Sequence, residues 1–443
     1  MRFHLNNALT SIAVLLLTLS LALPAQARGL LRDADMEYAL KQIAAPILRA
    51  AGLSPTRVKV LVVNDSSMNA FVVSNDAIFV HYGLINKMVN ATMLQGIIAH
   101  EAAHIANGHI ARRLGNLSNS RTISGLGLAL AAAAAAAGSP EAARGIAIGS
   151  ASSARRAFLS HTRSEEASAD QSGIRYMKAA GASPQGLADV LGLFAGQETL
   201  NVTRQDPYMR SHPLSRDRMR AVQGFVASYG TLPPNPAAEY WFARLKGKIT
   251  AHTRAPSWTL RRLKSEGYAD VRALREAVAL HRNSKTKKAL AAIDKAIALR
   301  PKDPFLRDQK AEILLDTRNF AAAVQVYASA VQRAPNDPLV LSGYGRALLA
   351  NGQVKKALGA LEKSRRQDYR DGSMLRDLAT AYAKTGQTGM AALITAERFA
   401  LGGRMKDAGI HAKRASGLLG RGSGPWQRAQ DVLIASQRAA KRK

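Results

Sequence analysis

The sequence predicts an α+β domain followed by an all-α solenoid of helical repeats. Valine-rich runs within residues 57–82 precede a long helical pattern, and the chain beyond Tyr268 repeats itself at a spacing of 34 residues. Strands and helices within one domain indicate α+β architecture, whereas a fixed period of this length indicates stacked helical hairpins. The 443 residues also exceed the usual length of a single domain.

The composition excludes several classes of protein. Hydrophobic residues make up 47% of the chain, which is enough to bury a core and excludes wholesale disorder. The chain has no cysteine, so disulfide frameworks, thiol nucleophiles, thiolate metal sites and thioester-linked lipid anchors are excluded. Catalysis or metal binding must therefore use histidine, carboxylate and hydroxyl side chains.

Residues 1–27 have the pattern of a cleaved signal peptide. Arg2 precedes an uncharged apolar run from Ala8 to Leu23, and Ala25-Gln26-Ala27 fits a small-residue cleavage site. An uncleaved membrane anchor is the alternative, but the run is shorter than the roughly 20 residues that a bilayer span needs. Because export without any cysteine suits a bacterial periplasm, we expect a periplasmic protein.

Residues 28–232 are predicted to form the α+β domain. Three β-prone runs are followed by one long helix: Arg57–Val63, Ala70–Val73, Ala77–Tyr82 and Thr92–Leu114. The turn residues Ser74-Asn75-Asp76 predict a hairpin between the second and third runs. Asn90 is a candidate cap for the helix, whose apolar residues recur at helical spacing and predict a buried face.

The second half is predicted to be a helical linker and a repeat domain. The segment Leu232-Pro233-Pro234-Asn235-Pro236 marks the boundary, so residues 233–267 form the linker and residues 268–443 the repeats. Equivalent positions recur every 34 residues: Ala289, Ala323, Ala357 and Ala391; Pro301 and Pro335; Asp303 and Asp337; Gly352 and Gly386. This pattern matches tetratricopeptide (TPR) repeats, the last of which is expected to end near Gly422-Ser423-Gly424-Pro425. The concave face of such a solenoid predicts protein or peptide binding, with a passive spacer as the alternative.

The long helix carries the motif His100-Glu101-Ala102-Ala103-His104. Histidines four residues apart lie on one helical face, so both imidazoles can bind the same metal ion. Glu101 is then placed to accept the proton of an attacking water. Zinc is the expected ion, and two solvated histidines on an amphipathic helix are the alternative.

A third ligand is expected from a second, acidic helix. His109 lies five residues after His104, and this spacing does not fit the metzincin pattern. Glu166 and Asp170 lie one helical turn apart, so Glu166 can bind the metal while Asp170 orients a histidine ligand. Glu165 points away by about 100° and is the weaker candidate. A solvated acidic face is the alternative.

These motifs resemble the HtpX and CAAX-prenyl-protease superfamily of gluzincin metallopeptidases. The likeness rests on residues 100–104 and on Glu-Ala-Ser-Ala-Asp at 166–170, and it extends to residues 69–71, 81–84 and 211–216. The resemblance implies a zincin-like metallopeptidase fold over residues 28–232, with one Zn²⁺ per chain. It also implies that Glu166 is the third zinc ligand, beside His100 and His104.

The resemblance further places His212, in the segment Ser211-His212-Pro213, near the metal. It implies that His212 is a fourth ligand in a latent state, or a hydrogen-bond donor to the transition state once displaced. A loop histidine packed on Pro213 is the alternative. Arg216 is a weaker candidate for positioning the substrate or the loop.

Two further features concern partners. Residues 122–140 are uncharged and alanine-rich, which favours a short helical hairpin that lies over the cleft or touches the membrane rather than a membrane span, with a low-complexity loop as the alternative. The chain has 62 lysines and arginines against 31 acidic residues, and the excess is greater after Tyr268. An anionic membrane surface or acidic client segments fit this charge, and no nucleic acid is expected for an exported chain.

Taken with the signal peptide and the repeats, the resemblance implies a zinc-dependent endopeptidase of the periplasm. Its expected partners are misfolded or assembling outer-membrane proteins and their assembly machinery, bound through the repeat domain. The alternative is a TPR assembly chaperone or adaptor whose protease site is largely latent.

Overall fold

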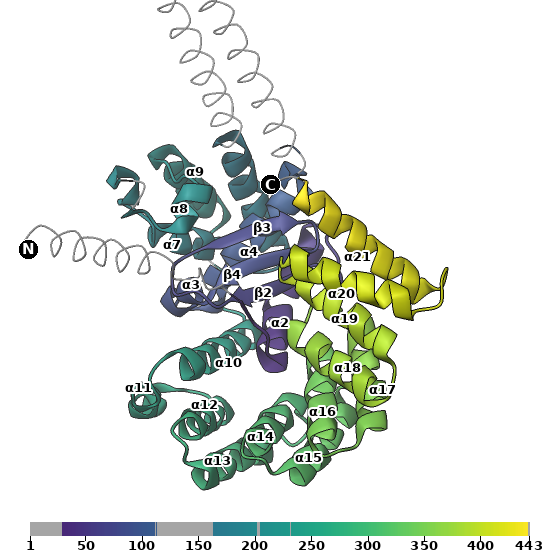
Figure 1. The fold of residues 1–443 in the computed structure, drawn as a ribbon. Helices are drawn as coiled ribbons and strands as arrows, with labels where there is room; N and C mark the ends of the chain where they lie inside the picture. Colours follow the sequence, from purple (N-terminus) through teal and green to yellow (C-terminus); the bar gives the residue numbers. More distant parts are fainter. Residues whose placement is uncertain (1–28, 111, 113–162, 202–203, 231, 442–443) are drawn as a thin grey trace, which may run out of the picture.

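The structure is a computed structural model that describes residues 29–110, 112, 163–201, 204–230 and 232–441. The predicted signal peptide and the alanine-rich segment 122–140 lie outside the described residues. A small sheet near the N-terminus is followed by helices up to the C-terminal end (Figure 1). Within the described ranges, every helix is too short or too polar to cross a membrane.

The sheet has four strands in the order β1-β2-β4-β3. The strands are β1 (Leu30–Leu31), β2 (Lys59–Val63), β3 (Ala70–Ser74) and β4 (Ala77–His81). β2 and β4 are parallel, whereas β1 pairs with β2 and β3 pairs with β4 in antiparallel fashion. The predicted hairpin is confirmed, and its turn is held by the Ser74 hydroxyl, which donates to Asp76 at 2.5 Å. β1 and β3 are the two edge strands.

Helices surround this sheet and form the core of the first domain. They are α2 (Ala34–Ala50), α3 (Tyr82–Lys87), α4 (Ala91–Ala106), a helix over residues 163–179, α7 (Gln185–Gly192), α8 (Pro207–Ser211) and α9 (Arg216–Tyr229). α2 packs on β2 and α4 packs on β3, and the two helices contact each other. The predicted α+β arrangement of this half is confirmed.

The long helix is shorter than predicted. Its N-terminal cap is Asn90 as expected, because the Asn90 side chain accepts a hydrogen bond from the Met93 backbone amide at 3.0 Å. The prediction that it continues to Leu114 is wrong: α4 ends at Ala106, and Gly108 adopts a left-handed φ of +70°. A residue in that conformation terminates a helix, and glycine adopts it without steric cost. Nearly all residues of α4 are buried, so the helix is enclosed rather than amphipathic.

The segment predicted as a linker is a packed helix that joins the two halves. α10 (Pro236–Thr253) lies between α2 and α12, and α11 (Pro256–Arg261) and the short 3₁₀ turn η3 (Leu263–Ser265) follow it. Arg244 of α10 is buried and forms ion pairs with Asp35 of the first domain at 2.7 Å and with Asp303 of the repeats at 2.6 Å. Breaking a buried ion pair leaves an uncompensated charge, so these contacts define how the halves meet.

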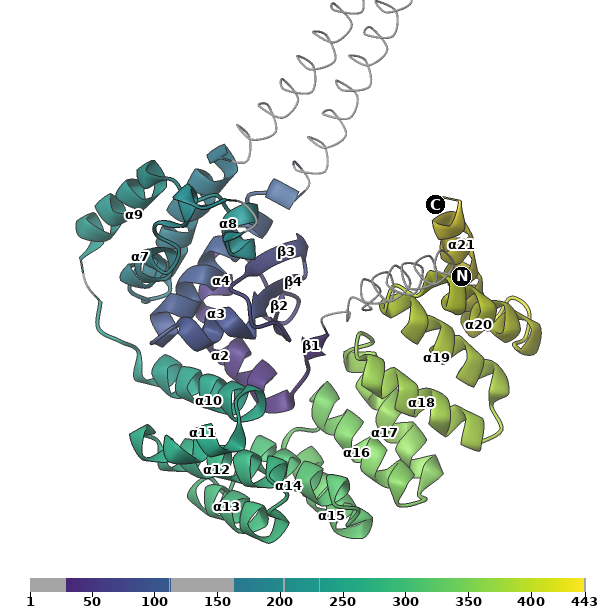
Figure 2. The same ribbon diagram turned by 60° about the vertical axis from the view of Figure 1, so that its left-hand side comes forward.

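The remaining helices form successive antiparallel pairs. Their bounds are α12 (Ala269–Arg282), α13 (Thr286–Leu299), α14 (Pro304–Asp316), α15 (Phe320–Arg333), α16 (Pro338–Ala350), α17 (Val354–Gln367), α18 (Gly372–Lys384), α19 (Thr388–Leu401), α20 (Met405–Leu418) and α21 (Gly424–Ala440). In Figure 2 these helices follow an arc that begins beside α10. The predicted all-α repeat architecture is confirmed, and at residues 422–425 the structure places the start of a further helix, because Ser423 caps α21.

The repeated residues have the roles expected of close helix packing and helix starts. Ala289, Ala323 and Ala357 are fully buried at the helix contacts. Asp303 and Asp337 cap α14 and α16, since each side chain accepts hydrogen bonds from two backbone amides at the start of its helix. In each case a proline follows at the first helical position, where no amide hydrogen is needed.

One turn position recurs through the repeats with a left-handed backbone. The four equivalent residues and their φ angles are Ser284 (56°), Arg318 (61°), Gly352 (75°) and Gly386 (79°). Glycine adopts this conformation readily, whereas a residue with a Cβ atom pays roughly 1–2 kcal/mol. The first two repeats therefore carry backbone strain that the later repeats lack.

We expect Arg318→Gly to stabilise the repeat domain by roughly 0.5–1 kcal/mol, because the relief of strain exceeds the added flexibility of the unfolded chain. Arg318 is exposed, so little packing is lost. The measurement is the midpoint of urea unfolding of the full chain. Gly352→Ala is the matched control and should lower the midpoint. A lower midpoint for Arg318→Gly would contradict the conclusion that the backbone at Arg318 is strained.

Candidate metal centre

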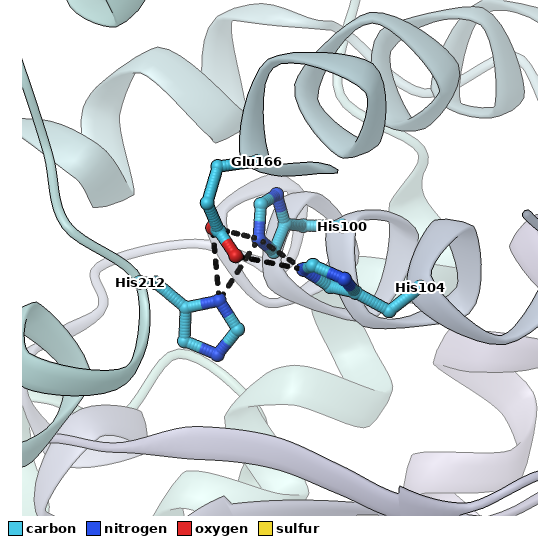
Figure 3. A group of neighbouring side chains, drawn as sticks. All are labelled: His100, His104, Glu166 and His212. Atoms are coloured by element: carbon cyan, nitrogen blue, oxygen red, sulfur yellow. Dashed lines mark hydrogen bonds and ion pairs between the residues drawn. The ribbon is translucent and has the colours of Figure 1, made fainter. Parts of the chain in front are cut away.

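Helix α4 places the imidazoles of His100 and His104 side by side in the interior. Both side chains are fully buried, and their Nε2 atoms lie 3.1 Å apart. The four-residue spacing puts them one turn apart on the same face, where both point toward the helix over residues 163–179 (Figure 3).

Glu166, on the helix over residues 163–179, faces this pair. Its Oε2 lies 3.2 Å from His100 Nε2, and its Oε1 lies 3.4 Å from His104 Nε2. The two helices approach closely at Gly173, where a Cβ atom would lie 3.2 Å from the His100 backbone nitrogen. The lack of a side chain at Gly173 therefore allows the carboxylate to reach the imidazoles.

His212 completes the cluster from the segment that follows α8. Its Nδ1 lies 3.0 Å from Glu166 Oε2 and 3.4 Å from His100 Nε2, and its ring stacks on Tyr208 with centroids 4.6 Å apart. One ligand atom from each of His100, His104, Glu166 and His212 lies within 4.8 Å of the others, and all four residues are buried. The structure thus brings together the four side chains that the sequence singled out.

Asp170 lies behind the first histidine. Its Oδ1 is 3.0 Å from His100 Nδ1, so the other ring nitrogen, Nε2, is the one that faces the cluster. Glu165, the weaker candidate, is buried but points elsewhere, with Oε1 3.8 Å from Arg112 Nε.

Two contributors to the site were not predicted. Arg218 of α9 is buried, donates to both oxygens of Asp170 at 2.7 and 2.9 Å, and donates to the Pro213 carbonyl at 2.8 Å. It therefore ties the acidic helix to the loop that carries His212. Arg216, the weaker candidate from the sequence, is exposed. A signal existed, because Arg218 lies four residues before Val222 on the same face of α9, and Val222 is buried.

His109 is the second unexpected contributor. Its spacing excluded it as a ligand, but the turn at Gly108 folds it back so that its Nδ1 lies 2.9 Å from His104 Nδ1. When His104 binds a metal through Nε2, its Nδ1 carries the proton and donates to His109. His109 thereby selects the tautomer of His104.

Two observations indicate that these residues suit a metal ion: the kind of ligand atoms they offer, and the buried Glu101 carboxylate beside them. Three imidazole nitrogens and one carboxylate oxygen are the kind of ligands that a tetrahedral zinc site uses. Glu101 is fully buried, and neither of its carboxylate oxygens has a hydrogen-bond partner among the described residues. Its Oε1 lies 3.5 Å from His212 Nε2. A buried carboxylate in this position is suited to accepting a proton from a water molecule beside the metal.

The charges of the cluster perturb one another strongly. Burial disfavours the protonated imidazole of His100, but the carboxylates of Asp170 and Glu166 outweigh it and raise its pKa to about 9. Burial likewise disfavours ionised Glu166, but His212, His104 and His100 outweigh it and hold the pKa of Glu166 well below its usual range. Burial also disfavours ionised Asp170, but His100 and Arg218 outweigh this effect and lower the pKa of Asp170. Without a cation, the protonated imidazole of His100 and the guanidinium of Arg218 therefore balance these buried carboxylates.

This balance makes the stability of the metal-free protein depend on pH. Because the folded pKa of His100 is raised from 6.5 to about 9, its contribution is complete below about pH 6.5 and is lost as the pH rises through 9. We therefore expect the urea concentration at the unfolding midpoint of chelator-treated protein to decrease as the pH is raised from about 6.5 to 9. His100→Gln removes the group and should flatten that part of the profile; an equal fall in this variant would contradict the assignment.

Comparisons with known proteins bear on both halves of the chain. Residues 33–226 match the family model of peptidase family M48, and residues 314–382 match a tetratricopeptide repeat model. A Yersinia pestis protein named beta-barrel assembly-enhancing protease is 23% identical over 351 residues, which cover 78% of this chain and 72% of that protein. Its namesake from Escherichia coli K12 is 21% identical over 395 residues, which cover 86% of this chain and 80% of that protein.

Another relative matches a smaller share of the chain. The Escherichia coli K12 metalloprotease YcaL is 28% identical over 196 residues, which cover 42% of this chain and 69% of that protein. The metallopeptidase resemblance drawn from the motifs, and its combination with C-terminal TPR repeats, are therefore confirmed. The alignments with the two assembly-enhancing proteases are long enough to include residues of both parts.

Proposed function

We propose that this metalloendopeptidase, whose residues 33–226 form a peptidase family M48 domain, uses one zinc ion per chain to hydrolyse outer-membrane proteins that fail to assemble in the periplasm. The observation that carries the proposal is the buried cluster of His100, His104, Glu166 and His212. Glu101, with no hydrogen-bond partner among the described residues, lies beside it.

The three imidazoles and the Glu166 carboxylate supply the donors that zinc prefers. A zinc ion bound there supplies Lewis acidity to the scissile carbonyl and lowers the pKa of a neighbouring water. We infer a zincin-like arrangement, because the helix that carries both histidines packs against the edge strand β3. In this arrangement His100, His104 and Glu166 are the permanent ligands.

Glu101 acts as the general base and then as the general acid. Its carboxylate accepts the proton of the attacking water and later returns this proton to the leaving amine. Asp170 orients the ring of His100. Arg218 donates to both Asp170 and the Pro213 carbonyl, and so fixes the His212 loop relative to Asp170. Neither Asp170 nor Arg218 needs to touch the substrate for this role.

The edge of the sheet offers a place for an extended substrate. β3 pairs with β4 on one side, and on its other side it pairs with no strand among the described residues. A substrate segment that adds to this edge must be unfolded, because a compact protein has no free strand to offer. This preference suits an enzyme that removes misfolded proteins and spares assembled ones.

The proposed clients and location rest on the relatives and on the sequence. Two relatives bear the name beta-barrel assembly-enhancing protease, and the repeats of this chain provide an extended surface for a client or an assembly partner. The signal-like residues 1–27 would direct the chain to the periplasm. The excess of basic residues would draw it to anionic membrane surfaces at low salt.

We expect Glu101→Gln to keep about one zinc per chain and to lower casein cleavage by roughly 10²–10⁴-fold, because only the proton acceptor is lost. Metal content is measured by mass spectrometry and cleavage by release of labelled peptides. Glu165→Gln, on a neighbouring buried carboxylate that faces away from the cluster, is the matched control. Retained cleavage by Glu101→Gln would reject the proposed base.

A second function is favoured by the position of His212. Its Nδ1 already lies among the other ligands, so it would occupy the position that an attacking water needs. A site closed in this way suits a TPR assembly chaperone or adaptor whose protease is largely latent. The two functions separate in cells: a chaperone role survives Glu101→Gln but is lost when the chain is truncated before Tyr268.

We expect His212→Ala to raise casein cleavage by at least about tenfold, because a side chain that competes for the open position has been removed. The rate is compared with wild type at equal zinc content. Lower cleavage in His212→Ala would contradict latency and would instead indicate that His212 donates to the transition state.

A further inference from the structure

A cavity of about 890 Å³ lies between the two halves of the chain, away from the metal cluster. One wall comes from α2 and β2 of the peptidase domain, and the other comes from α10 and the segments that lead into α14 and α16. None of the proposed zinc ligands lines it. The cavity therefore needs a separate explanation from the hydrolytic site.

Three aromatic rings from three different helices meet at this cavity. Tyr38 of α2 lies 4.7 Å from Phe305 of α14 and 5.1 Å from Trp241 of α10, measured between ring centroids. Tyr38 and Trp241 are only partly buried. Such a cluster presents an apolar surface to which an aromatic or aliphatic side chain can bind.

The acidic residues around the cavity all have partners within the protein, whereas some of the basic residues have no acidic partner. Its lining contains five basic residues and three acidic ones: Lys41, Lys59, Arg300, Lys302 and Arg333, against Glu37, Asp303 and Asp337. All three acidic side chains are engaged within the protein. Glu37 pairs with Arg32, Asp303 pairs with Arg244, and Asp337 accepts two backbone amides of α16.

Two of the basic residues also have partners. Lys59 pairs with Asp368, and Arg300 pairs with Asp270. The other three, Lys41, Lys302 and Arg333, are exposed and have no ion pair with a carboxylate in the described part of the chain. The cavity therefore combines an apolar aromatic surface with three cations that lack a counter-charge.

We propose that this cavity binds an extended acidic segment of a partner protein, with an apolar or aromatic side chain on the ring cluster and carboxylates at Lys41, Lys302 and Arg333. Charge complementarity selects the acidic segment and the aromatic cluster fixes its register. A hollow with walls from two domains admits a polypeptide chain but not the flat surface of a bilayer. The binding needs no cleavage, so it does not depend on the proposed proteolysis.

Because the two walls of the cavity belong to different halves of the chain, a bound segment would affect how these halves are arranged. Tyr38 and Lys41 belong to the peptidase domain, whereas Lys302, Phe305 and Arg333 belong to the repeats. A segment that contacts both walls binds best when they stand as in this structure. Its binding therefore stabilises the arrangement of the repeats against the peptidase domain.

The test uses the full chain carrying Glu101→Gln, so that the probe is not cleaved. The probe is a fluorescein-labelled peptide of glutamates and aspartates around one phenylalanine, and its partner replaces the acids by glutamine and asparagine. In low salt, the acidic peptide should bind at least about tenfold more tightly than its amide partner. Binding should also change the fluorescence of Trp241, one of three tryptophans, and Trp241→Phe should remove that change.

A matched pair of variants locates the binding. Lys41→Glu, Lys302→Glu and Arg333→Glu together should weaken acidic-peptide binding by at least about tenfold. Lys287→Glu, Lys288→Glu and Lys355→Glu make the same change in net charge at exposed residues outside the cavity, and should change it less than about twofold. Unchanged unfolding midpoints check that both variants fold.

Three results would overturn the proposal. The first is equal weakening in the two triple variants, which would mean that only overall charge attracts the peptide. The second is equal binding of the acidic and amide peptides. The third is displacement of the acidic peptide by phosphatidylglycerol vesicles with no change in Trp241 fluorescence, which would assign the cations to a membrane surface.

Discussion

The site depends on the close approach of two helices that are far apart in sequence. α4 and the helix over residues 163–179 meet at Gly173, and this contact places the Glu166 carboxylate against the imidazoles of His100 and His104. Ionised carboxylates are costly to bury unless opposite charges surround them. Here Arg218 and the protonated imidazole of His100 provide these charges, so packing and electrostatics require each other. A metal ion held by the same residues would supply positive charge at the same point.

Buried ion pairs also hold the two halves of the molecule together. Lys248 and Arg244 of α10 lie fully inside the protein and pair with Asp33 and Asp35 at the start of α2. Arg244 also reaches Asp303, which caps the first turn of α14. Because a partner left alone in the interior would carry an unpaired charge, these contacts favour one orientation of the repeats. The cavity beside α2 is lined by residues from both halves in this orientation.

Local patterns in the sequence predicted the parts of the fold that depend on spacing. The 34-residue period identified the repeats, and the four-residue spacing of His100 and His104 identified two ligands on one helix face. Features that depend on contacts between distant segments were not visible in this way. Arg218 of α9 reaches Asp170 from 48 residues away, and no local period encodes this contact, because it results from how whole helices pack. The contact of His109 with His104 is local, and its sequence signal is the glycine at position 108 that ends the helix.

The account rests on one divalent cation held by residues of three separate segments. X-ray absorption at the zinc edge, on purified wild type and Glu166→Ala, measures this most directly. The expected result is one zinc per chain with only nitrogen and oxygen ligands at about 2.0–2.2 Å, and loss of the metal or of one oxygen ligand in the variant. Zinc that is absent from the wild type, or that keeps an unchanged coordination shell in Glu166→Ala, would contradict it.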